Sequence, residues 1–183
     1  MSQGRRPSPR HGISPSIPRR ELPRYEVIEG LVSQFGAPPR AVLAFITLSI
    51  VLDEFAEAQT VHFQRYGLSH SRFVTLMLLW KSKAHQLTPL EIASGVGVRP
   101  ATVTGLVAGL ERDGLVERRP DTADRRVVVV HLQPKGQKLL ESILPDHMAR
   151  IAKVAEGLSD ADLESLTRTL TLVRDRLDVL RDP

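Results

Sequence analysis

The chain has 183 residues, a net charge of +4 and an apolar fraction of 42%, which is ordinary for a globular protein. This length supports one domain with or without extensions. The absence of cysteine excludes disulfide bonds and thiol-based redox sensing and fits a reducing cytoplasm, and the N-terminus lacks an apolar segment long enough for a secretory signal.

The positive charge lies in two segments of the chain. Residues 1–24 carry a net +5 and residues 81–140 a net +4, whereas residues 25–80 carry −2 and residues 141–183 carry −3. Cationic side chains bind nucleic-acid phosphates with release of counterions, so these two segments are the candidates for contact with a polyanion. Residues 1–24 are also rich in Pro, Ser and Arg, which predicts a flexible basic tail, or alternatively an arm that lies along DNA.

Two helices are expected over residues 25–66, as an N-terminal dimerisation region. The first runs from Tyr25 to Phe35, with an apolar face made of Ile28, Leu31, Val32 and Phe35. The second runs from Ala41 to Tyr66 and is apolar on most sides, as a buried dimer-core helix would be. Its apolar run ends at Leu52, which is too short for a membrane span of about 20 residues.

Residues 67–133 contain the pattern of a winged helix-turn-helix. The first helix is expected after Ser69 or Ser71, with an apolar face made of Phe73, Leu76, Met77 and Trp80. Thr88 and Glu91 then form a capping box with Pro89 at the first helical position, and Gly95 and Gly97 favour a tight turn.

The next helix is expected to begin at Pro100 and to be a recognition helix. Val103, Leu106, Val107 and Leu110 recur at helical spacing, and Gly114 can end the helix in a left-handed cap. The opposite face is small and polar, which lets a helix enter a major groove and meet base edges.

After Gly114, Leu115–Val116 and Val127–Val130 are expected to be two strands of a β-hairpin, with a turn over residues 120–126. An arginine at the hairpin tip can enter a narrow minor groove, and a carboxylate two residues before it can orient the guanidinium. Arg125 and Arg126 are both candidates for that role.

Residues 134–183 are expected to form two C-terminal dimerisation helices. The first begins at Pro134, kinks near Leu144 because of Pro145, and ends at Gly157. Its expected inner side chains are Leu140, Ile143, Leu144, Met148 and Ile151. The second begins with Ser159 and Asp162 and carries a coiled-coil-like seam, for which we expect an intermolecular partner, made of Leu163, Leu166, Leu170, Val173, Leu177 and Leu180.

These motifs, in this order, resemble the MarR family of bacterial transcriptional regulators. The matching elements are the capped helix, the Thr102-Val103-Thr104 helix, Asp113-Gly-Leu-Val-Glu-Arg118, Asp121-x-x-Asp-Arg-Arg126 and Leu132-x-Pro-Lys-Gly136. The chain departs from the family pattern at Val127, Gly105 and Ala108. The resemblance implies a mainly α fold with a small β-hairpin wing and flanking helices that form a dimerisation region.

The resemblance also implies a homodimer that binds a pseudo-palindromic operator in double-stranded DNA, with repression as the favoured mode. It places the second helix in the major groove and a wing arginine in the minor groove. The expected DNA-binding residues are Arg99, Pro100, Ala101, Thr102, Thr104, Gly105, Arg112, Arg118, Asp124, Arg125 and Arg126.

A small aromatic or anionic effector is expected to modulate such a dimer by binding one of its states better. His62, Arg65, His70 and Trp80 are the candidate ligand-binding residues; the alternative is that the Trp is core and the histidines are solvated or hydrogen-bonded.

Two other function classes make different predictions. No hydrolase, metalloprotease or phosphate-binding motif occurs, so we expect no enzyme, metal or cofactor. A winged helix used only for protein contacts is the alternative to a DNA-binding regulator, and it predicts weak DNA binding that does not depend on salt.

Overall fold

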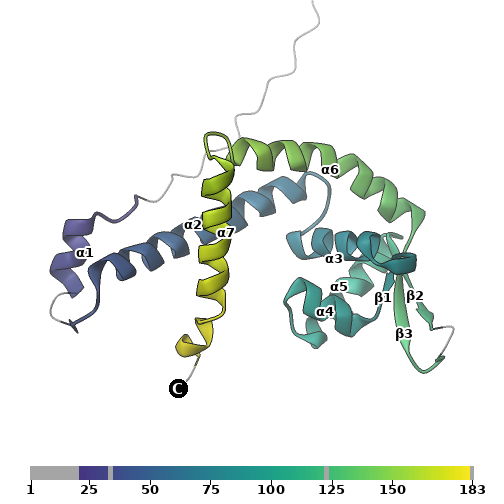
Figure 1. Cartoon of the computed structure of the whole chain (residues 1–183). Helices are drawn as coiled ribbons and strands as arrows, with labels where there is room; N and C mark the ends of the chain where they lie inside the picture. Colours follow the sequence, from purple (N-terminus) through teal and green to yellow (C-terminus); the bar gives the residue numbers. More distant parts are fainter. Residues whose placement is uncertain (1–20, 33–34, 122–123, 182–183) are drawn as a thin grey trace, which may run out of the picture. The chain divides into compact units, whose positions relative to one another are not determined.

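The computed structural model describes residues 21–32, 35–121 and 124–181 (Figure 1). The predicted basic tail therefore lies mostly outside the described residues. The described residues divide into two compact units, the first ending at Gly67 and the second beginning at Leu68.

The described part of the first unit consists of α1 (Tyr25–Val32) and α2 (Pro39–Gln64), which pack against each other. Ile28 and Val32 are the buried residues of α1. The predicted apolar face was wrong in its other half, because Leu31 is 57% exposed and Phe35, which follows the helix, is 74% exposed.

The helix predicted from Ala41 to Tyr66 is confirmed as α2, with Pro39 as its first residue. A proline is tolerated there because the first helical N–H groups have no partner within the helix. Burial of this helix on most sides, as in a dimer core, stays a prediction, because the single chain leaves much of its apolar surface exposed. Its exposed large apolar side chains are Phe45, Val51, Leu52, Phe55 and Val61.

The second unit contains the winged helix-turn-helix and two further helices. Its elements are α3 (His70–Lys81), η2 (Lys83–His85), β1 (Gln86–Leu87), α4 (Pro89–Val96), α5 (Pro100–Arg112), β2 (Val116–Pro120), β3 (Val128–Leu132), α6 (Pro134–Val154), α7 (Asp160–Arg174) and η3 (Leu177–Leu180).

Helix α3 lies at the centre of this unit and contacts α4, α5, α6 and β3. The Ser69 hydroxyl caps it by accepting the Arg72 N–H. The side chains of α3 that are fully buried are Thr75, Leu76 and Leu79, and Phe73 is 6% exposed. Met77 and Trp80 are only half-buried, so the predicted apolar face was rotated away from the true one.

The small sheet has three antiparallel strands in the order β1-β3-β2. The two predicted hairpin strands are confirmed as β2 and β3, with Arg118 opposite Val130 and Pro120 opposite Val128. Strand β1 was not predicted; it places Leu87 opposite Val130 and so holds the start of α4 beside the wing.

Helix α6 is unbroken across Pro145 and begins against the junction of α5 and β2. A Cβ atom added to Gly136 would lie 2.3 Å from the Leu115 carbonyl oxygen, so only glycine fits at this close approach. The inner face of α6 holds Leu140, Ile143 and His147. Met148 and Ile151 were predicted to lie inside, but they are 52% and 39% exposed.

Helix α7 begins as predicted. The Ser159 hydroxyl accepts the Asp162 N–H at 3.2 Å and the Asp162 carboxylate accepts the Ser159 N–H at 3.0 Å. The helix ends at Arg174, so Leu177 and Leu180 lie in the separate turn η3 and the predicted seam was too long. Leu163 and Val173 are half-buried, and Leu166, Leu170, Leu177 and Leu180 are exposed in the single chain.

Candidate nucleic-acid interface

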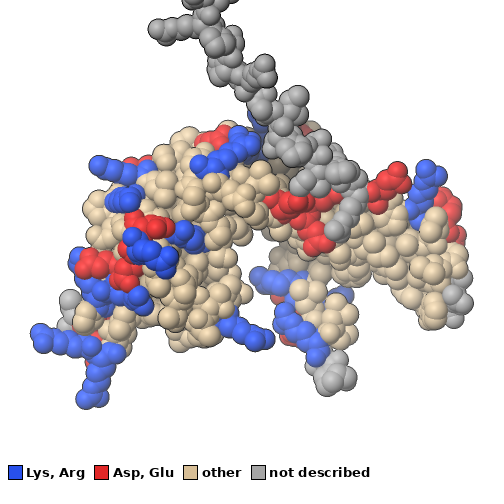
Figure 2. All heavy atoms as spheres, turned by 180° about the vertical axis from the view of Figure 1, so that it is seen from behind, with Lys and Arg blue, Asp and Glu red and all other residues tan. Residues whose placement is uncertain are grey.

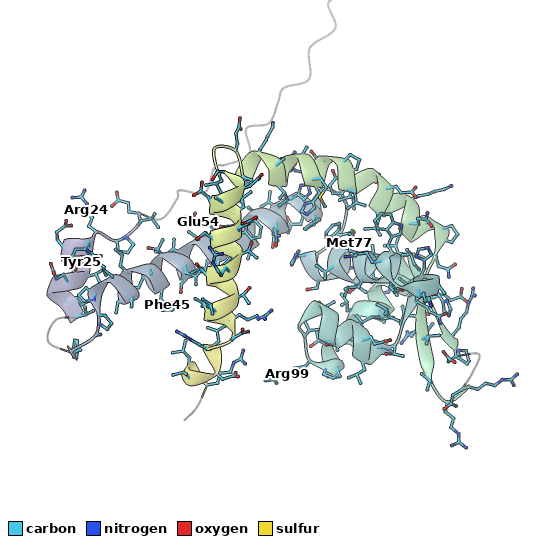
Figure 3. The ribbon with its side chains drawn as sticks, in the orientation of Figure 1. Arg24, Tyr25, Phe45, Glu54, Met77 and Arg99 are labelled. Carbon is cyan, nitrogen blue, oxygen red and sulfur yellow. The ribbon has the colours of Figure 1, made fainter. Side chains whose placement is uncertain are left out.

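The predicted reading face of α5 is open to solvent. Val103, Val107 and Leu110 are buried and fix the helix on the core. The residues of the predicted DNA-binding set that belong to α5 are all exposed, namely Pro100, Ala101, Thr102, Thr104, Gly105 and Arg112. Arg99 is the exposed N-cap residue, and Figure 3 shows it at the edge of the α4–α5 pair.

A capping box fixes the start of α4, and a left-handed glycine ends it before the turn to α5. The Thr88 hydroxyl accepts the Glu91 N–H at 3.3 Å, and the Glu91 carboxylate accepts the Thr88 N–H at 2.7 Å. That backbone N–H bond lowers the pKa of Glu91 below its ordinary value. Gly97 has a φ of 74° and ends α4 in the left-handed conformation.

Gly95 has a different role from the one predicted. It lies inside α4 rather than in the turn, and a Cβ atom there would meet Leu78 Cδ1 at 2.6 Å. Its lack of a side chain therefore lets α4 approach α3 closely.

The C-terminal end of α5 is held by polar side chains from two other helices. Arg72 of α3 forms an ion pair with Asp113 and donates to the Gly109 carbonyl at 3.3 Å. Lys135 of α6 donates to the Asp113 carbonyl at 2.8 Å. The hydrogen bond from Arg72 lowers the pKa of Asp113, which stays ionised at neutral pH. These bonds fix the position of the helix that would read DNA.

Gly114 ends helix α5 in a left-handed cap, as predicted. Its φ of 69° places it in the left-handed region. The Leu115 N–H donates to the Leu110 carbonyl at 3.0 Å and the Gly114 N–H to the Glu111 carbonyl at 2.9 Å, which is the Schellman pattern. The chain thereby turns from α5 directly into β2.

Carboxylates bind the backbone of the wing turn rather than its arginine side chains. Asp121 accepts the Asp124 N–H at 3.1 Å, and Asp124 accepts the Arg126 N–H at 2.9 Å. The prediction that Asp124 orients a guanidinium was therefore wrong in its geometry, because the acidic group binds the main chain. Figure 2 shows Lys and Arg side chains gathered over the hairpin end, at the lower left of that view.

Arginines of the wing fall into two groups. Arg118 donates to Glu111 at 2.6 Å, and its backbone N–H donates to the same carboxylate at 3.0 Å. Arg119 donates to Glu117 at 2.7 Å. Hydrogen bonding from these arginines lowers the pKa values of Glu111 and Glu117. Arg118 therefore links β2 to α5, a structural role beside the DNA contact that was predicted for it.

The second group consists of arginines without a carboxylate partner. Across residues 21–32, 35–121 and 124–181, no ion pair within 4.0 Å involves Arg99, Arg125 or Arg126. All three are exposed. Their charge is available to an external anion.

The candidate ligand residues are divided between the two units. His62 and Arg65 belong to the first, and His70 and Trp80 to the second. His62 is buried, with its ring edge-on to Phe63 at a centroid distance of 4.9 Å. Partial burial lowers the pKa of His70. A shallow apolar groove along α2 contains none of the four candidates and is lined by Arg40, Leu43, Ala44, Thr47, Leu48 and Val51.

The described residues contain neither a cluster of metal ligands nor a helix that could span a membrane. No group of three His, Asp or Glu side chains is arranged to hold a metal ion in that part of the chain. No described helix combines the length and the apolar character that crossing a membrane requires.

Comparisons with known proteins agree with the helix-turn-helix geometry. The family described as "MarR family" matches residues 68–128. The chain is 34% identical over 164 residues to the HTH-type transcriptional repressor YetL of Bacillus subtilis, and this alignment covers 89% of the chain and 98% of that repressor.

Solved structures share the fold. The MarR family regulator Sco3205 from Streptomyces coelicolor, solved in complex with DNA, superposes with a TM-score of 0.73 at 22% identity over 77% of this chain and 89% of that one. CouR from Rhodococcus jostii RHA1, solved with p-coumaroyl-CoA, gives a TM-score of 0.62 at 26% identity over 69% and 88%. Because residues 68–128 match the MarR family and the chain is 34% identical to YetL over nearly the whole of that repressor, the chain belongs to the MarR family of transcriptional regulators.

Proposed function

We propose that the chain is a homodimeric repressor that binds a pseudo-palindromic operator and is released by a small aromatic or anionic ligand. The observation that carries the DNA-binding part is the pairing pattern of the arginines. Arg99 at the start of α5 and Arg125 and Arg126 at the wing are exposed without carboxylate partners, whereas Arg118 and Arg119 of β2 are paired with Glu111 and Glu117. Repression is supported by the similarity to YetL.

Dimerisation is proposed on the basis of exposed apolar surface and of DNA geometry. Helix α7 leaves Leu166 and Leu170 exposed one turn apart on the same face, and exposed apolar surface of this kind marks an interaction site. A two-fold dimer would place two recognition helices about 34–36 Å apart, one turn of the duplex. We assign residues 67–133 to reading DNA and residues 25–66 and 134–183 to the dimer.

An effector is proposed because CouR, at 26% identity, is described with bound p-coumaroyl-CoA. A ligand releases DNA only by binding one state of the dimer better than the other. Trp80 is half-buried, so its fluorescence should report a ligand near α3. Titration with a panel of aromatic carboxylic acids tests this part, and a flat response to every acid would count against it.

Selection of bound sequences from random duplex DNA tests the DNA-binding part of the proposal. A palindrome is expected. A matched pair of variants then tests whether the unpaired arginines bind DNA more strongly than the paired ones. Arg126→Ala removes one arginine from each protomer, so it should weaken operator binding by about tenfold or more and reduce the salt slope by about two. Arg118→Ala should weaken it less, because that side chain already binds Glu111.

Equal losses of operator affinity in the two variants would contradict the assignment of Arg126 to DNA and of Arg118 to Glu111. Weak DNA binding that does not change with salt would favour the other candidate, a winged helix used for protein contacts. The basic tail over residues 1–24 is tested by deletion, since an arm on DNA predicts a lower salt slope without it.

A further inference from the structure

The outward face of α5 has almost no side-chain bulk at its centre. Ala101, Gly105, Ala108 and Arg112 follow one another at helical spacing, opposite the buried Val103, Val107 and Leu110. Ala101, Gly105 and Arg112 are exposed and Ala108 is half-buried. A Cβ atom built on Gly105 would have no heavy atom within 4 Å, so no side chain of the described residues fills that space.

The same helix lacks the side chains that read bases by paired hydrogen bonds. From Pro100 to Leu110 the sequence contains no Arg, Lys, Asn, Gln, Asp or Glu. Bidentate contacts to guanine need Arg or Lys, and those to adenine need Asn or Gln. Such contacts are therefore confined to the two ends of the helix, at Arg99 and Arg112.

What α5 offers between those ends is methyl groups. Thr102 and Thr104 are exposed and flank the bare centre on its two sides, and Ala101 adds a third methyl. Within the described residues, the Thr102 and Thr104 hydroxyls make no hydrogen bond. Thymine is the base that presents an apolar group in the major groove, its 5-methyl, and Ala and Thr methyls are its usual contacts.

We propose that α5 selects its operator by packing the methyl groups of Thr102, Thr104 and Ala101 against thymine 5-methyl groups in each half-site. Hydrogen-bonded base recognition is left to Arg99 and Arg112. This proposal rests on the proposed function, because it requires that α5 enter a major groove. It predicts that each selected half-site has at least one thymine under the centre of the helix.

The first test removes the thymine methyl groups from the DNA. The full-length protein is titrated into the selected operator with each thymine in turn replaced by deoxyuridine, which keeps base pairing and deletes the 5-methyl. One contacted methyl should be worth about fourfold in affinity, and the symmetric pair in both half-sites about fifteenfold. As a matched control, 7-deazaguanine at central guanines, which lacks the N7 acceptor, should change affinity by less than about twofold.

The second test removes either the methyl or the hydroxyl from the protein. Thr104→Ser deletes only the methyl, and Thr104→Val keeps methyl groups and deletes the hydroxyl. The Ser variant should bind about fifteenfold more weakly, because the dimer carries two copies, and it should lose its response to deoxyuridine at one thymine pair. The Val variant should bind within about twofold of the wild type. The same pair of substitutions applies at Thr102, and both positions are exposed, so the fold is retained.

The outcomes separate this proposal from the proposed function. If selection returns no shared sequence, the proposed function fails and this inference fails with it. A palindrome without central thymines would overturn the inference alone, as would indifference to deoxyuridine. Variants in which Val binds worse than Ser at both threonines would also overturn it, because the hydroxyls would then be the reading groups.

Discussion

The close approach between α6 and the α5–β2 junction makes a quantitative prediction for Gly136. In Gly136→Ala the new Cβ would lie 2.3 Å from the Leu115 carbonyl oxygen and 2.8 Å from Leu132 Cδ1. Real Cβ atoms keep at least 3.0 Å, so the backbone of one partner must move by more than half an ångström. The Leu115 oxygen also accepts the Gln133 N–H at 3.0 Å, so this movement strains a hydrogen bond as well.

The expected cost follows from those two effects. Overpacking of a well-packed site costs about 1–3 kcal/mol, and one strained backbone hydrogen bond adds about 1 kcal/mol. We expect Gly136→Ala to lower the free energy of unfolding by about 2–4 kcal/mol, or the Tm by roughly 10 °C. Guanidinium or thermal unfolding at one fixed protein concentration measures it, since oligomer stability depends on concentration.

A matched substitution at another glycine should change the free energy of unfolding in the opposite direction. Gly105→Ala places a methyl in open space on an exposed helix and should raise stability by about 0.5–1 kcal/mol, because alanine loses less conformational entropy. If Gly136→Ala were as stable as the wild type, the backbone contact would not limit this site. If both variants lost stability equally, the loss would come from alanine itself and the steric argument would fail.

An ion pair, an exposed leucine and a strained backbone angle each lead to a further prediction. Arg72→Met should make the protein less stable than the wild type at neutral pH and increase amide hydrogen exchange at the C-terminal end of α5. Arg72 lowers the pKa of Asp113 in the folded protein below 3.8, its ordinary value. The stability that this ion pair contributes is therefore fully present above pH 3.8 and is lost as the pH falls through the lower pKa of the folded state. The urea unfolding curves of the variant and the wild type should converge in acid. Leu170→Glu should yield monomers in sedimentation velocity, and a surviving dimer would exclude α7 from the interface. Ala84→Gly should raise the Tm, because Ala84 has a φ of 55° that glycine adopts without strain; an unchanged Tm would contradict this.

Local signals account for the parts of the fold that the sequence predicted well. Thr88 with Glu91, Gly114, and Ser159 with Asp162 each act within a few residues, and the structure has the corresponding caps. Helical periodicity likewise identified α5 and its buried face. Such features depend on the chain near them, so a single sequence suffices to find them.

Contacts between distant residues account for the errors. Arg72 and Asp113 are 41 positions apart, and nothing in one sequence pairs them. The two-residue strand β1 exists because β3 is beside it, and it is too short to have a pattern of its own. Met148 and Ile151 looked inward by hydropathy, yet His147 is the buried residue, with its ring 5.1 Å from that of Phe73. In each case tertiary packing determined which residues pair or are buried, where the periodicity of the sequence allowed more than one arrangement.

The contacts at the C-terminal end of α5 also determine where its other end lies. Arg72, Lys135 and the Glu111–Arg118 pair set the direction of the helix there, and the buried Val103, Val107 and Leu110 hold it along its length. Thirteen residues span about 20 Å, so a change of about 5° in that direction would displace the Arg99 end by about 2 Å. Side chains that never touch a base can therefore decide whether Arg99 reaches one.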